Sequence, residues 1–189
     1  MYENMIQLYQ KITHLKVLSL FLENPHEGYY LRESARLLDM DPMTVRRSLK
    51  LLMEDGFLTK VEDKNRTIYK ANLGNPALRY LKISYNLSFL QEKDVVNFIV
   101  DRMKSVTSIV LFGSFAKGEN DENSDVDILT ISMDKNKPTA ALAELLERDV
   151  NLVNFTPAQW SNQAKSNRAF YLDVIIDGIS LYGVKPVVE

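Results

Sequence analysis

Apolar residues recur at helical spacing in three segments of the first third of the chain: 12–22, 32–40 and 43–54. Asn24-Pro25 ends the first segment, because proline cannot continue a helix. Asp41 and Pro42 stand before the third segment, where aspartate suits the N-cap and proline suits the first helical position. We therefore predict three short helices, with Gly56 as the C-terminal cap of the third.

The pattern then changes to short runs that are rich in β-branched and aromatic residues. The runs 57–61 and 67–71 flank a polar turn, which predicts a β-hairpin. Turn-forming residues in the stretch 71–76 break the composition, and we place a domain boundary there. Amphipathic helices are predicted beyond this boundary over 76–90 and 95–103.

The last half of the chain alternates apolar, strand-like runs with amphipathic segments. Strands are predicted for four runs: 108–112, 125–133, 150–155 and 179–183. Helices are predicted for three segments: 139–148, the stretch that follows the Thr156 cap and Pro157, and 170–176. This alternation predicts a second domain that contains both helices and strands.

One stretch between the first two of these strands carries the candidate chemistry. Gly113 lets another group approach the backbone closely, and Ser114 offers a hydroxyl and a neighbouring N–H to an anionic oxygen. Ten residues separate Ser114 from Asp125, and Asp125 and Asp127 share one face if they lie on a strand. Two carboxylates beside a phosphate-binding turn suit a divalent cation that is bound to a nucleotide. The alternative interpretation is a Gly-Ser turn followed by a solvated acidic loop.

The pattern Gly113-Ser114, ten residues, Asp125-x-Asp127 resembles the signature of minimal nucleotidyltransferases in the polymerase-beta-like superfamily. The resemblance implies a small mixed sheet flanked by helices, with the motif at one end of the sheet. It implies that Gly113, Ser114 and Lys117 bind the nucleotide, and that Asp125 and Asp127 are catalytic and bind Mg²⁺. The implied reaction transfers a nucleotidyl group from ATP, or another nucleoside triphosphate, to an acceptor hydroxyl. Similar minimal nucleotidyltransferases often act as antitoxins that adenylylate a tyrosine of a partner toxin.

Residue 151 departs from the pattern of this family. Active members usually carry a third carboxylate on the strand after the helix, and the matching residue here is Asn151. Asparagine offers a carbonyl oxygen to a metal ion but no charge. We therefore predict that Asn151 is a neutral ligand of the metal ion, beside Asp125 and Asp127. The missing carboxylate is expected to lower the rate of transfer while nucleotide binding persists.

The first domain resembles a winged helix-turn-helix, because three helices precede a hairpin. Residues 41–58 are similar to the recognition helix and strand entry of bacterial and archaeal winged-helix regulators. In such domains this helix enters the major groove of DNA. The predicted DNA-binding residues lie off the core face of the helix or in the hairpin turn: Thr44, Arg46, Arg47, Lys50, Lys64 and Arg66. The alternatives are a protein-contacting domain and a merely solvated basic face.

Composition excludes several other classes of protein. The chain has 189 residues with 46% hydrophobic residues and a net charge of −2, which indicates a folded protein of one or two domains. It has no cysteine, and its two histidines, His14 and His26, lie far from the motif, so disulfides and cysteine- or histidine-based sites are not expected. There is neither an apolar run of about 20 residues nor a signal-peptide pattern, so we predict a cytoplasmic protein without membrane contact.

The sequence thus predicts an α+β protein with a winged helix-turn-helix domain (1–74), a linker helix (75–94) and a nucleotidyltransferase domain (95–189). The first hypothesis is an enzyme that transfers AMP from Mg-ATP to an acceptor hydroxyl and also binds DNA. The alternative is a transcriptional regulator whose second domain is a catalytically weak nucleotide sensor or a dimerisation unit. Winged-helix proteins usually bind DNA as dimers, so a homodimer is expected. The other expected partners are a nucleoside triphosphate and a partner toxin.

Overall fold

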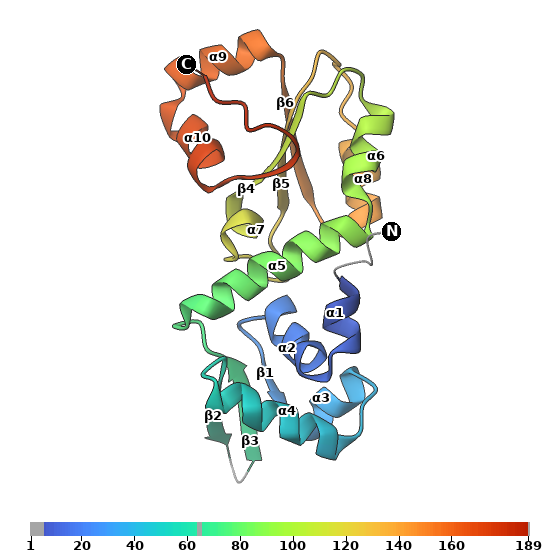
Figure 1. Ribbon diagram of the computed structural model, residues 1–189, viewed down its shortest axis with the longest axis vertical. Coiled ribbons are helices and arrows are strands. Elements are labelled where there is room, and N and C mark those ends of the chain that lie inside the picture. Colours follow the sequence, from blue (N-terminus) through green and yellow to red (C-terminus); the bar gives the residue numbers. More distant parts are fainter. Residues whose placement is uncertain (1–5, 64–65, 189) are drawn as a thin grey trace. The chain divides into compact units, whose positions relative to one another are not determined.

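The computed structural model of the chain describes residues 6–63 and 66–188 (Figure 1). It divides into two compact units, of which the first ends at Phe89 and the second begins at Leu90. Each unit has its own sheet and its own helices. In the part of the chain that is described, no helix is long and apolar enough to cross a membrane.

Helices and a small antiparallel sheet form the first unit. Its elements in chain order are α1 (Ile6–Lys11), α2 (Thr13–Glu23), β1 (Gly28–Tyr30), α3 (Leu31–Leu37), α4 (Pro42–Glu54), β2 (Leu58–Asp63), β3 (Arg66–Ala71) and α5 (Pro76–Glu92). The strand order is β1-β3-β2, and β2 and β3 form the predicted hairpin. Helix α1 has no counterpart among the predicted elements, and α3 ends earlier than the predicted segment 32–40.

Local signals in the sequence set both ends of α4. Oδ2 of Asp41 accepts the backbone N–H of Thr44 at 3.0 Å, which satisfies one of the free donors of the first turn. Gly56 follows the helix with a φ of +75°, a left-handed conformation that glycine adopts without strain. The predicted N-cap and C-terminal glycine are therefore confirmed.

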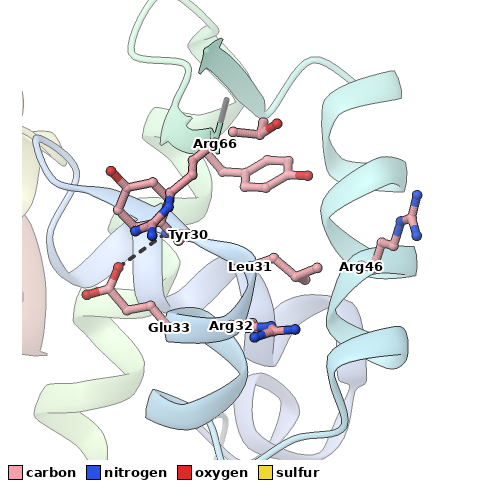
Figure 2. Close-up of a pocket in the computed structure, with 8 residues that line it drawn as sticks. Tyr30, Leu31, Arg32, Glu33, Arg46 and Arg66 are labelled. Atoms are coloured by element: carbon pink, nitrogen blue, oxygen red, sulfur yellow. Dashed lines mark hydrogen bonds between the residues drawn. The ribbon is translucent and has the colours of Figure 1, made fainter. Parts of the chain in front are cut away.

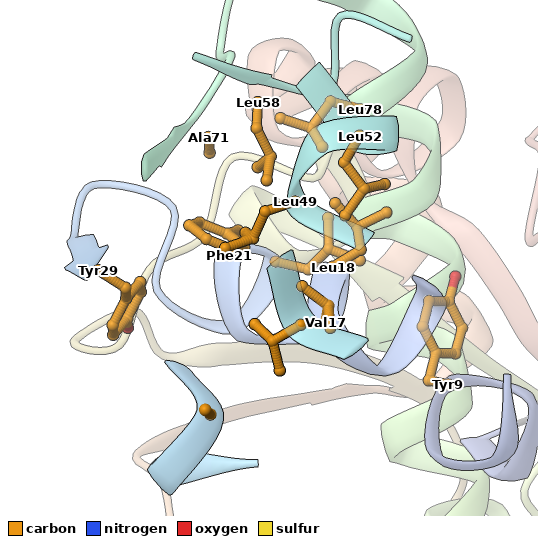
Figure 3. Packing of buried hydrophobic residues seen from close by; sticks show 13 residues of the cluster. Tyr9, Val17, Leu18, Phe21, Tyr29, Leu49, Leu52, Leu58, Ala71 and Leu78 are labelled. Atoms are coloured by element: carbon orange, nitrogen blue, oxygen red, sulfur yellow. The ribbon is translucent and has the colours of Figure 1, made fainter. Parts of the chain in front are cut away.

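The core of the first unit lies between α2 and α4 (Figure 3). Phe21 and Leu18 of α2 are fully buried, as is Leu49 of α4. Leu78 of α5 belongs to the same buried cluster. Burial of each such side chain contributes about 1.5–3 kcal/mol to stability. Because the first unit extends to Phe89, most of the segment predicted as a linker (75–94) belongs to this unit.

A mixed four-stranded sheet forms the centre of the second unit. The elements of this unit are α6 (Val95–Arg102), β4 (Ser108–Phe112), α7 (Gly113–Lys117), β5 (Val126–Ile131), α8 (Thr139–Leu146), β6 (Val150–Phe155), α9 (Pro157–Ser166), α10 (Arg168–Leu172), the π-helical turn η1 (Asp173–Asp177) and β7 (Ile179–Gly183). The strand order is β6-β5-β4-β7, with β5 and β6 parallel and the other pairs antiparallel. The expected mixed sheet with flanking helices is confirmed.

Helices cover both faces of this sheet, with α6 and α8 on one side and α9 and α10 on the other (Figure 1). All five residues of β4 are buried, as its continuous apolar run predicts. Val110 and Phe112 point to the face where Trp160 of α9 and Tyr171 of α10 are buried, because alternate residues of a strand share a face. The central strand β4 is thus fixed from both sides up to its last residue.

Candidate functional site

The two parts of the predicted motif meet where β4 ends. Phe112, the last residue of β4, pairs with Asp127 of β5, and Asp127 in turn pairs with Asn151 of β6. Asp125 precedes β5, which begins at Val126, so the expected strand starts one residue later than predicted. The register therefore brings the Gly-Ser turn and the second aspartate side by side.

Gly113 lies directly against the carboxylate of Asp127. Its φ is +66°, and a Cβ at this position would collide with Oδ2 of Asp127. A larger residue is thus excluded twice, by the backbone conformation and by the lack of space. Gly113 and Ser114 begin the short helix α7, and Gly118 closes it with a φ of +68°.

Asp127 is partly buried and is held by Asn151. Nδ2 of Asn151 donates a hydrogen bond to Oδ1 of Asp127 at 3.0 Å. Burial raises the pKa of the Asp127 carboxyl above its usual range, while the bond from Asn151 acts in the opposite direction. The negative charges of Asp125 and Asp173 also raise this pKa. Asn151 therefore stabilises a carboxylate that its own environment disfavours.

The loop before Asp125 is fixed by hydrogen bonds to its own backbone. The hydroxyl of Ser124 accepts the backbone N–H of Asp121 at 2.9 Å and donates to the carboxylate of Asp121 at 2.9 Å. Arg148 donates to the carbonyl oxygens of Asp121 and Glu122 at 3.1 and 2.8 Å. No role was predicted for Arg148, although this residue ties the loop to the segment that follows α8. The arrangement restricts the position of Asp125.

Lys117 lies beside two further carboxylates that the sequence analysis did not select. Its Nζ is paired with Asp173, and it lies 3.4 Å from Oδ2 of Asp177. The hydrogen bond to Asp173 raises the pKa of the Lys117 ammonium. Both aspartates belong to η1. The sequence signal that could have identified them is their spacing of four residues within an apolar run. The predicted contact of Lys117 with a triphosphate stays a prediction.

Two side chains of the candidate site are suitable ligands for a hard divalent cation. Asp125 and Asp127 supply carboxylate oxygens, which Mg²⁺ prefers, and the absence of a side chain at Gly113 lets the Asp127 carboxylate lie directly against the Gly-Ser turn. Among the described residues no group of three acidic, histidine or cysteine side chains is arranged to hold a metal ion. Asp125 and Asp127 are the residues that would hold a Mg²⁺ ion, and substrate phosphates, water or Asn151 would complete its coordination.

The predicted DNA-binding residues lie in the first unit. Helix α4 buries one face and exposes Arg46, Arg47 and Lys50 on the other. Thr44 is half-buried, and Lys50 lies 3.6 Å from Glu54 of the same helix. Arg66 begins β3 and is exposed, whereas Lys64 lies outside the described residues. The exposed basic side chains of α4 are thus available to a ligand.

Comparison with known proteins gives one family and a few solved structures. Residues 92–175 match the family model of the nucleotidyltransferase domain. A toxin–antitoxin structure with AMP-PNP is 25% identical, with a TM-score of 0.39 and coverage of 51% of this chain and 76% of its own. A mutant of the toxin–antitoxin pair MntA-HpeT is 22% identical, with a TM-score of 0.38 and coverage of 50% and 74%. No curated protein matches the chain. The stretch that matches the family contains the whole candidate site from Gly113 to Asp173.

Proposed function

We propose that the second unit transfers a nucleotidyl group from a nucleoside triphosphate, with ATP as the first candidate, to an acceptor hydroxyl. The observation that carries the proposal is the contact between the backbone of Gly113 and the carboxylate of Asp127, with Asp125 close by. This contact places a turn without side-chain bulk beside two carboxylates. The family match over 92–175 supports the same reaction class.

In the proposed reaction the nucleotide phosphates lie along Gly113 and Ser114. The hydroxyl of Ser114 donates to a phosphate oxygen, and Asp125 and Asp127 hold Mg²⁺. Mg²⁺ held by Asp125 and Asp127 would neutralise charge on the phosphates and polarise the α-phosphate. The acceptor oxygen bonds to the α-phosphorus, the bond to the bridging oxygen breaks, and pyrophosphate leaves while the hydroxyl proton passes to solvent. Lys117 reaches the phosphates only if it leaves Asp173, so we assign it to the edge of the site.

The acceptor belongs to a separate molecule. A tyrosine hydroxyl of a partner toxin is the acceptor that the resemblance to minimal nucleotidyltransferases favours, and RNA and small molecules are the alternatives. Asn151 holds Asp127 but brings no charge, so we expect slow transfer. Replacing it by aspartate tests this point.

Calorimetric titration of ATP, with and without Mg²⁺, is the first experiment. We expect magnesium-dependent binding to the wild type and none to the Asp125→Ala/Asp127→Ala variant. Labelled ATP and candidate acceptors then test transfer itself. Equal binding to both proteins would contradict the proposed site. The Glu122→Ala variant is the matched control, because its exposed side chain lies in the preceding loop.

The Asn151→Asp variant tests the missing carboxylate. The change removes the donor to Oδ1 of Asp127 and adds a negative charge, so we expect the free energy of unfolding to fall by about 1–3 kcal/mol without metal. Mg²⁺ should recover most of this loss and transfer should become faster than in the wild type. Thermal unfolding with and without Mg²⁺ measures the first effect. Unchanged metal dependence would exclude residue 151 from the metal site.

A second function, DNA binding by the first unit, is favoured by the exposed basic face of α4 beside an antiparallel hairpin. We propose that the unit acts as a winged helix, with two copies of the chain on two half-sites. The expected result is salt-sensitive binding to DNA from the protein's own promoter, weakened in the Arg46→Ala/Arg47→Ala variant. Equal affinity for unrelated DNA would argue against a regulator.

A further inference from the structure

Three arginines line one groove of the first unit. The groove encloses 650 Å³ and is lined by side chains of β1, α3, α4 and β3, among them Arg32, Arg46 and Arg66. Figure 2 shows Arg66 beside Tyr30, with Arg46 on α4 at the opposite side of Leu31. Only Arg46 and Arg66 were predicted to bind a ligand, and Arg32 was not.

Strand pairing explains why residues so far apart in sequence meet here. Tyr30 at the end of β1 pairs with Ile68 of β3 in antiparallel register, and α3 begins at the next residue. The chain after Tyr30 therefore runs towards the beginning of β3, where Arg66 lies. Helix α4 packs against α3 and adds Arg46 from its first turns. The fold therefore places the three arginines around one groove.

The positive charge of this groove is not balanced by the groove's own residues. Within the described residues none of the three arginines forms an ion pair with a carboxylate. Glu33 is the single carboxylate among the lining residues, and it accepts the backbone N–H of Tyr30 at 3.2 Å. The lining thus carries three guanidinium groups and one carboxylate. Like charges that share a groove repel each other, and an anion between them removes this repulsion.

The walls of the groove suit an anion that is attached to a planar ring. Tyr30 and Tyr69 are half-buried, and the Arg66 guanidinium lies 5.9 Å from the centre of the Tyr30 ring. Guanidinium groups bind phosphate oxygens in pairs and stack on flat rings. The volume of 650 Å³ lies within the range of about 300–1,000 Å³ found for small-molecule sites.

We infer that this groove binds phosphate groups of nucleotide units through Arg32, Arg46 and Arg66 together. The phosphates come either from the backbone of a DNA duplex or from a free nucleotide. The inference is independent of nucleotidyl transfer, and it rests on the proposed DNA binding only where the duplex is the source. Arg32 is the residue that this inference adds.

The test uses the full chain in EDTA, so that the magnesium-dependent site of the second unit does not contribute. A fluorescein-labelled 20-base-pair duplex is titrated by anisotropy at several salt concentrations, and AMP is titrated by the NMR signals of the arginine Nε–H groups. The variants are Arg32→Ala, Arg46→Ala and Arg66→Ala. Arg36→Ala is the matched control, because Arg36 is an exposed arginine one turn further along α3 that does not line the groove.

Each phosphate contact that is lost should lower the salt slope of duplex binding by about 1 and the affinity roughly eightfold at 0.1 M salt. We expect this loss for all three variants and less than a twofold change for Arg36→Ala. Thermal unfolding is expected to be unchanged, since all three side chains are exposed. If the duplex shows this dependence, DNA is the source, and if only AMP shows it, a free nucleotide is.

Four results would overturn the inference. The first is that all three single variants bind both probes as the wild type does, and the second is that Arg36→Ala weakens binding as much as Arg32→Ala. The third is a loss of duplex binding in Arg46→Ala/Arg47→Ala with no effect of Arg32→Ala, which would leave DNA binding intact and exclude the groove. The fourth is that the wild type binds neither the duplex nor AMP, which would exclude both the phosphate-binding groove and DNA binding by the first unit.

Discussion

The two units handle their charged side chains in opposite ways. In the groove of the first unit three arginines face one carboxylate that is already engaged by the backbone. In the second unit Lys117 is paired with Asp173 and Asp177, and Asp127 is held by Asn151. The groove of the first unit therefore keeps an excess of positive charge, whereas Lys117 and Asp127 of the second unit have partners within the chain. The difference predicts that removing a paired charge such as Lys117 costs stability in the second unit, whereas removing one of the three groove arginines costs ligand affinity in the first.

The largest expected effect is that of Asp127→Asn. Removing a metal ligand should weaken magnesium-dependent ATP binding at least ~100-fold, since mutating residues that only hydrogen-bond to metal ligands already lowers metal affinity about 10–100-fold. Stability should change in the other direction, because burial raises the pKa of Asp127 and so disfavours its charged form at pH 7. The wild type gains stability as the pH falls through this raised pKa towards 3.8, and the variant does not. Calorimetry and denaturant unfolding at pH 7 and near pH 4 measure both effects.

Gly113→Ala should show the next largest effect. The change introduces a side chain at a φ of +66° and against Asp127, which should cost about 1–3 kcal/mol of stability and impair nucleotide binding. Gly74→Ala is the matched control, because its Cβ would meet nothing closer than 3.5 Å. Similar losses of stability in the two variants would show that the position beside Asp127 is not special.

Lys117→Met tests the internal charge balance directly. The variant leaves Asp173 and Asp177 without their cation, and we expect a loss of roughly 1 kcal/mol at pH 7. Because pairing raises the pKa of Lys117, its contribution is complete below 10.5 and disappears as the pH rises through the raised pKa. Urea unfolding at pH 7 and above pH 10.5 measures the difference. Lys93→Met is the control, since its partner Glu147 is exposed and should contribute less.

The smallest expected effect is that of Lys50→Gln in the first unit. Lys50 and Glu54 are both exposed and lie four residues apart on α4. Such pairs contribute about 0.3–0.5 kcal/mol, so unfolding should hardly change. A loss of stability as large as that of Lys117→Met would contradict the distinction between the two units.

Local features of the site could be predicted from the sequence, and contacts between distant residues could not. Asp41 as an N-cap, the buried run of β4 and the spacing from Ser114 to Asp125 are readable because each depends on near neighbours. The pairing of Lys117 with Asp173 joins residues 56 positions apart. The meeting of Arg32 with Arg66 likewise depends on the register between β1 and β3. No periodicity of the chain records either contact.

The π-helical turn η1 could not be predicted from the sequence pattern. The apolar run 170–176 predicted a helix, and the structure has α10 followed by η1. Asp173 and Asp177, the first and last residues of η1, both lie beside Lys117. The helical character of the apolar run could be predicted from the sequence, whereas the contacts of Asp173 and Asp177 with Lys117 required the tertiary structure.

The pairing of β7 with β4 has a consequence for the order of synthesis. β7 is the last strand within the described residues, and it hydrogen-bonds to β4, which lies more than sixty residues earlier in the sequence. A ribosome releases the first unit with its arginine groove long before β7 and η1 emerge. The first unit is expected to fold while the remainder is still being made, because domains fold as units during synthesis. A nascent chain arrested before Ile179 would therefore present a finished groove and an unfinished nucleotide site.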